Sequence, residues 1–107
     1  MELLEYQRLA QRTSNTKTSS EKIENGLMGL NGEAGECIDI LKKYRFQGHE
    51  LDRTKLLDEL GDVLWYIAEA ASGLGITMED IAIHNIGKLK KRYPEGFDSE
   101  RSRHREA

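Results

Sequence analysis

The sequence predicts an all-α protein that forms a single domain. The chain has 107 residues, which is enough for one domain and too few for two. Apolar residues recur at spacings of three and four along the long segments, and the chain contains only one proline and one valine. Two matches to the capping-box pattern mark helix starts. We therefore expect four helices.

The first helix is expected over about residues 2–12, and the polar run 13–20 is expected to be a linker. Thr18 and Glu21 have the spacing of a capping box, so the second helix should begin near Ser19. It should end at residues 47–49. We expect its core-facing stripe to consist of Ile23, Leu27, Leu30, Ala34, Ile38 and Leu41.

Asp52 is the expected N-cap of a third helix, which residues 72–75 should stop. Thr77 and Asp80 repeat the capping-box spacing, and the fourth helix should run to about Tyr93, because Pro94 cannot continue it. The domain core is expected over about residues 19–97, with 98–107 as a charged, solvated tail. The apolar stripe of the third helix is Leu56, Leu60, Val63, Leu64, Ile67, Ala71 and Leu74.

Composition argues against several classes of protein. The net charge is −3, from 16 basic and 19 acidic residues, so no basic excess favours binding to a nucleic acid polymer. The longest apolar run, residues 63–68, is far shorter than the ~20 residues of a membrane span. The sequence shows no secretory signal and has one cysteine, which favours a cytoplasmic protein without disulfides. A core this small favours self-association.

Two pairs of carboxylates suggest a metal site. Glu33 and Glu36 lie three positions apart on the second helix, and Glu59 and Asp62 repeat this spacing on the third. Residues at i and i+3 share a helix face, and a short connection makes the two helices antiparallel neighbours, so the four acids can converge. Crowded carboxylates favour a hard divalent cation, and the absence of histidine and cysteine favours Mg²⁺ or Mn²⁺ over Zn²⁺.

Two other interpretations of the acids remain open. A single ExxE pair is common on exposed helices, so the acids could form the solvated face of a non-catalytic helical interaction module. A di-iron bundle generally uses Glu-x-x-His pairs, and no histidine has that spacing here. The matched second pair favours a metal site, as do glycines that suggest the close approach of a backbone or a ligand. These glycines are Gly29, Gly32, Gly35 and Gly61.

Three ordered blocks carry a more specific signal than either acid pair. They are GLMGLNGEAGE at residues 26–36, LDELGDVLWY at 57–66 and NIGKLKKRYP at 85–94. Together they resemble the MazG-like nucleoside triphosphate pyrophosphohydrolases, and the resemblance covers most of residues 20–97.

The resemblance implies a four-helix bundle completed by homodimerisation, as a dimer or a dimer of dimers. It implies an Mg²⁺-dependent enzyme of nucleotide-pool housekeeping that cleaves a nucleoside triphosphate between its α- and β-phosphates. By position, the metal ligands would be Glu33, Glu36, Glu59 and Asp62, with Glu33 or Glu36 orienting the attacking water. Many members carry a further acid where this chain has Gly32.

The leaving pyrophosphate also requires cationic or polar side chains. Lys55 lies one turn before Glu59, and the fourth helix carries a polar stripe of Asn85, Lys88 and Arg92. Tyr66 follows Asp62 by four residues and could pack on a base or sugar. Trp65 is expected to point elsewhere and to serve in packing.

Overall fold

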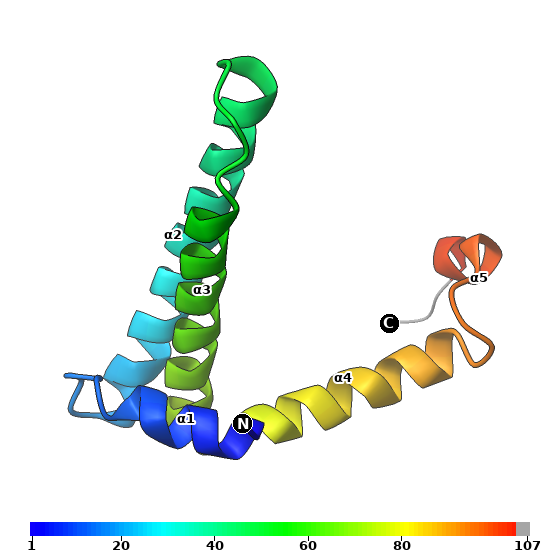
Figure 1. Ribbon diagram of the computed structural model, residues 1–107. Coiled ribbons are helices and arrows are strands. Elements are labelled where there is room, and N and C mark those ends of the chain that lie inside the picture. The colour runs from blue at the N-terminus through cyan, green and yellow to red at the C-terminus, as the bar shows by residue number, and fades with distance from the viewer. Residues whose placement is uncertain (105–107) are drawn as a thin grey trace.

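The computed structural model describes residues 1–104, which form five helices and no β-strand (Figure 1). The all-α prediction is confirmed. No helix in this part of the chain combines the length and the apolar character that crossing a membrane requires. The helices are α1 (Leu3–Gln11), α2 (Ser19–Phe46), α3 (Arg53–Leu74), α4 (Met78–Arg92) and α5 (Ser99–Arg103).

Helices α2 and α3 form a long antiparallel hairpin, and α1 lies across its base, where it contacts α3 and α4 (Figure 1). Helix α4 starts at this base and runs away from the hairpin, so the described part of one chain does not close the expected four-helix bundle (Figure 1). The hairpin therefore places the helix that carries Glu33 and Glu36 beside the helix that carries Glu59 and Asp62, and α4 extends away from both.

The predicted helix caps are present. Thr18 and Glu21 form a complete capping box at the start of α2, and Thr77 and Asp80 form another at the start of α4. The Asp52 side chain accepts a hydrogen bond from the backbone N–H of Lys55. Helix α3 ends at Gly75, whose φ of 71° places it in the left-handed region that favours glycine.

Within the expected charged, solvated tail, residues 99–103 form a short helix, α5, that the sequence analysis did not predict. Asp98 caps this helix by accepting a hydrogen bond from the N–H of Glu100, and Arg101 Nε donates to the backbone carbonyl of Arg92. These local hydrogen bonds stabilise a short helix even though its side chains are mostly exposed. Residues 105–107 of the predicted tail lie outside the described residues.

The side of α2 that faces α3 differs from the prediction. Gly26 packs directly on α3, since a Cβ added there would lie 2.6 Å from the backbone nitrogen of Ala70. Small residues thus make the helix contact, because they allow the two backbones to approach closely. The predicted stripe is consequently exposed at Leu27, Ile38 and Leu41, and α3 likewise exposes Leu60, Leu64 and Leu74.

The small core lies at the base of the hairpin, where α1, α3 and α4 meet. Its buried members are Ala10, Ala68, Ala71 and Met78, and Tyr6, Trp65 and Ile67 pack against them.

A buried carboxylate fixes the linker between α1 and α2 to this base. The Glu69 side chain is fully buried and accepts hydrogen bonds from Gln11, Ser14, Thr16 and Asn25. Burial alone would raise the pKa of Glu69, but these hydrogen bonds favour the charged form and together lower the pKa below its ordinary value. Lys22 adds an ion pair at 3.7 Å. The linker is therefore part of the packed structure.

Candidate metal centre

Three carboxylates converge between α2 and α3. Glu33 of α2 and Glu59 and Asp62 of α3 each offer an oxygen, and these oxygens all lie within 4.8 Å of one another. Glu33 and Glu59 are half-buried and Asp62 is exposed. Glu36 is exposed and does not belong to this group, although it lies close enough for its charge to act on Glu33. The structure thus brings together three of the four acids that the spacing singled out.

The crowding of these acids changes the protonation of Glu33. Its pKa rises from 4.5 to about 7, mainly because it shares a hydrogen bond with Glu59 and also because of burial. The negative charges of Glu59, Asp62 and Glu36 raise this pKa further. At pH 7 Glu33 is therefore protonated in about half of the molecules, and a cation could replace this proton. The donor set is entirely carboxylate oxygen, which fits a hard ion such as Mg²⁺ or Mn²⁺.

This raised pKa predicts a specific pH dependence in metal-free buffer. The folded protein binds a proton at Glu33 more tightly than the unfolded chain does, so this protonation makes a contribution to the free energy of unfolding. The contribution is complete below pH 4.5. The contribution is lost as the pH rises through about 7. We expect chemical denaturation with chelator to show this loss in the wild type and not in Glu33→Gln. Identical pH profiles for the two proteins would contradict the prediction.

A shallow cavity of about 280 Å³ adjoins the carboxylates and is lined by Glu33, Asp62, Trp65 and Tyr66. The expectation that Trp65 points away from the site was wrong. Trp65 follows Asp62 by three residues, the same spacing that pairs the acids, so it shares their side of α3. This i+3 relation is the signal that could have identified Trp65 from the sequence.

Tyr66 reaches the cavity because Gly29 leaves space for it. A Cβ at Gly29 would overlap the Tyr66 ring, so the expected close approach occurs at this glycine. At the other three glycines of the predicted set, a Cβ would have no described atom within 4 Å beyond the adjacent residues and the local helix backbone: Gly32, Gly35 and Gly61. Within the described part of one chain, only Gly29 of this set shapes the site.

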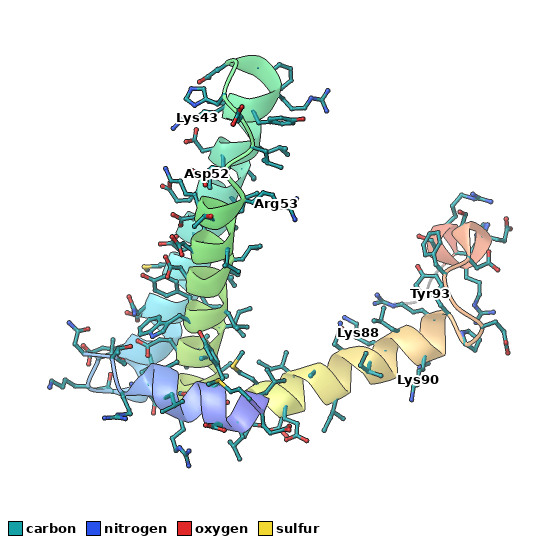
Figure 2. All side chains as sticks on the ribbon, viewed as in Figure 1. Lys43, Asp52, Arg53, Lys88, Lys90 and Tyr93 are labelled. Atoms are coloured by element: carbon teal, nitrogen blue, oxygen red, sulfur yellow. The ribbon has the colours of Figure 1, made fainter. Side chains whose placement is uncertain are left out.

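The other predicted substrate residues lie outside the cavity. Lys55 is exposed one turn before Glu59. The pKa of Asp39 is lowered mainly by a hydrogen bond from Lys43, and the positive charge of Lys55 contributes to the same shift. Helix α4 carries Asn85, Lys88 and Arg92 away from the hairpin, and Figure 2 shows Lys88 on this outlying helix. One described chain therefore does not bring the α4 residues to the carboxylates.

Comparison with known proteins identifies the family. Residues 21–97 match the family model for the MazG nucleotide pyrophosphohydrolase domain. The chain belongs to the MazG family. The MazG match includes α3, α4 and both acid pairs, and it excludes α1, the linker and α5.

A relative supports the assignment to the MazG family. The chain is 35% identical over 82 residues to the Gene 37 protein of Mycobacterium phage L5, covering 73% of this chain and 72% of that protein. No solved structure matches the chain.

Proposed function

We propose that the protein is a nucleoside triphosphate pyrophosphohydrolase that releases a nucleoside monophosphate and pyrophosphate. The observation that carries the proposal is the convergence of Glu33, Glu59 and Asp62 from two adjacent helices. Membership of the MazG family supports the same reaction class. The proposed role is housekeeping of the cytoplasmic nucleotide pool.

The three converging carboxylates are the proposed ligands of Mg²⁺, with Mn²⁺ as a substitute. The closeness of their oxygens, all within 4.8 Å of one another, supports this assignment, because crowded negative charges favour a cation between them. A bound divalent ion neutralises phosphate oxygens and lowers the pKa of water. Glu36, the fourth proposed ligand, lies at the solvent edge; Glu36 or Glu33 would accept a hydrogen bond from the attacking water and orient it toward phosphorus.

The reaction is tested with a panel of ribo- and deoxynucleoside triphosphates in the presence of Mg²⁺. We expect at least one nucleotide to yield monophosphate and pyrophosphate in equal amounts, and a chelator to stop the reaction. Product analysis by ion-exchange chromatography distinguishes the bond that is cleaved. Release of orthophosphate and nucleoside diphosphate would contradict cleavage between the α- and β-phosphates. Failure to cleave any triphosphate would favour the non-catalytic interaction module.

We further propose that the active form is a homodimer or a dimer of dimers. Large apolar side chains remain exposed on all three long helices, for example Ile38 at 67%, Leu57 at 71% and Ile83 at 63%. A second copy of the chain would cover these stripes and complete the helical bundle. It would also give α4 a hairpin to pack on, and so bring Asn85, Lys88 and Arg92 to the phosphates of a substrate beside Lys55.

Introducing charge into an apolar stripe tests the dimer. We expect Ile38→Asp to sediment as a monomer at micromolar concentration, where the wild type sediments as a dimer or tetramer, because burying an unpaired carboxylate is costly. Lys91→Asp serves as the control and should remain associated, because Lys91 is exposed and lies on the polar side of α4, away from Ile83. A wild-type protein that sediments at 12.2 kDa at every concentration would contradict this prediction.

A further inference from the structure

The Trp65 ring is held in a fixed orientation by the segment that precedes the family match. Its indole N–H donates to Thr13 Oγ1 at 2.8 Å and to the Ala10 carbonyl at 3.1 Å. The Thr13 hydroxyl in turn donates to the same carbonyl at 2.8 Å. With its only polar hydrogen occupied, the indole offers a ligand nothing but its π surface and edge.

The two aromatic rings of the cavity form a corner. The ring centroids of Trp65 and Tyr66 are 5.1 Å apart, and their planes meet at 84°. A flat heteroaromatic ring stacked on one of them would meet the other edge-on, and both contacts are favourable for aromatic pairs. The corner therefore suits a nucleobase.

The support for this corner comes from residues 1–18. Glu69, one turn beyond Trp65 on α3, accepts hydrogen bonds from Ser14 and Thr16, and Lys22 Nζ donates to the same two hydroxyls. The linker is thereby fastened to α3 by buried and half-buried polar contacts next to Trp65. An ordered linker is what a rigid wall beside the cavity requires.

The lining of the cavity indicates which end of the substrate lies in it. The lining residues that the structure describes are two carboxylates and two aromatic rings, with no cationic side chain among them. Apart from the cation proposed at the carboxylates, a pyrophosphate group there would have no positive partner among the lining residues, whereas an uncharged base and sugar would not need one. Lys55 lies in the opposite direction along α3, seven residues before Asp62, which is about 10 Å of helix rise.

We propose that Trp65 is a specificity-determining contact for the nucleoside end of the substrate and that Thr13, in the segment before the family match, is its positioning residue. The triphosphate then runs past the carboxylates toward Lys55. This inference rests on the proposed function for the identity of the substrate, but the contact itself is measurable without turnover.

Fluorescence tests the contact directly, because Trp65 is the single tryptophan of the chain. With Mg²⁺ present, titration with nucleoside monophosphates should cause a saturable loss of Trp65 emission for at least one base, and inorganic pyrophosphate should cause none. A response to pyrophosphate alone would overturn the inference. So would silent fluorescence in a protein that cleaves triphosphates, and the proposed function would then survive without it. Saturable quenching by a monophosphate in a protein that cleaves no triphosphate would support the contact and reject the function.

Variants of Thr13 test the positioning role. Thr13→Val keeps the side-chain volume and removes the hydroxyl, so we expect KM to rise roughly three- to tenfold, the effect of one lost hydrogen bond, with kcat changed less than about twofold. Thr13→Ser keeps the hydroxyl and should restore KM. Trp65→Phe, which lacks the indole N–H, should raise KM at least as much as Thr13→Val. Unchanged KM in both Thr13→Val and Trp65→Phe, or a loss confined to kcat, would overturn the inference.

Discussion

Replacing Asp62 with asparagine should lower the rate of pyrophosphate release by about a hundredfold or more, a loss comparable to removing one transition-state stabilising group from an active site. The asparagine would keep the size of the side chain but lose the negative charge that completes the cluster with Glu33 and Glu59. Divalent-metal binding should weaken in the same variant. Steady-state assays measure the first effect, and calorimetry with Mn²⁺ and no nucleotide measures the second.

The matched control for this prediction is Asp58→Asn. Asp58 lies on the same helix one turn before Asp62, is exposed, and does not belong to the converging group. Its substitution removes the same charge and should change the rate less than about fivefold, as expected of a screened surface charge. Equal losses in the two variants would show that net charge on α3, and not the cluster, governs activity. Full activity in Asp62→Asn would reject Asp62 as a metal ligand.

The local signals of the fold could be read from the sequence because they depend on neighbouring residues. The capping boxes at Thr18 and Thr77 place a hydroxyl and a carboxylate three residues apart, and both form as the spacing predicts. The short helix α5 was missed, since the charged composition of residues 98–104 suggested solvation and its capping by Asp98 is a weaker signal.

The side of α2 that packs on α3 could not be predicted from the sequence in the same way. Periodicity finds an apolar side of a helix but does not say which surface covers it. Helix α2 has two usable sides, a large apolar stripe that includes Ile38 and a small-residue side that includes Gly26. Packing within the chain uses the small side, because close backbone approach at Gly26 and the fit of Tyr66 against Gly29 require it.

In the candidate site, too, local spacing predicted some features, whereas others depend on how the helices pack. The i and i+3 spacing on each helix identified Glu33, Glu59 and Asp62 as residues that could converge. It could not show that Glu36 stays at the edge, because that depends on the rotation of α2 against α3. The hydrogen bond between Trp65 and Thr13 was equally hidden, since it joins residues 52 positions apart.

Replacing Gly26 with alanine should destabilise the hairpin. An added Cβ would lie 2.6–2.8 Å from the N, Cα and Cβ atoms of Ala70, and backbone atoms cannot move aside as the end of a flexible side chain can. The helices must separate, which typically costs about 1–3 kcal/mol for an overpacked contact, partly offset by up to ~1 kcal/mol of improved helix propensity. We expect a net loss of about 1–2 kcal/mol and a lower melting temperature by roughly 5–10 °C.

Gly35→Ala isolates the steric effect, because it makes the same chemical change on the same helix. A Cβ at Gly35 meets no described atom within 4 Å beyond the adjacent residues and the local helix backbone, so the gain in helix propensity should raise the free energy of unfolding by ~0.5–1 kcal/mol. Both variants are measured by chemical denaturation at one protein concentration, because association would also shift stability. The two substitutions should therefore change stability in opposite directions. Stabilisation by both would show that α2 and α3 do not touch at Gly26, whereas destabilisation by both would place another surface against Gly35.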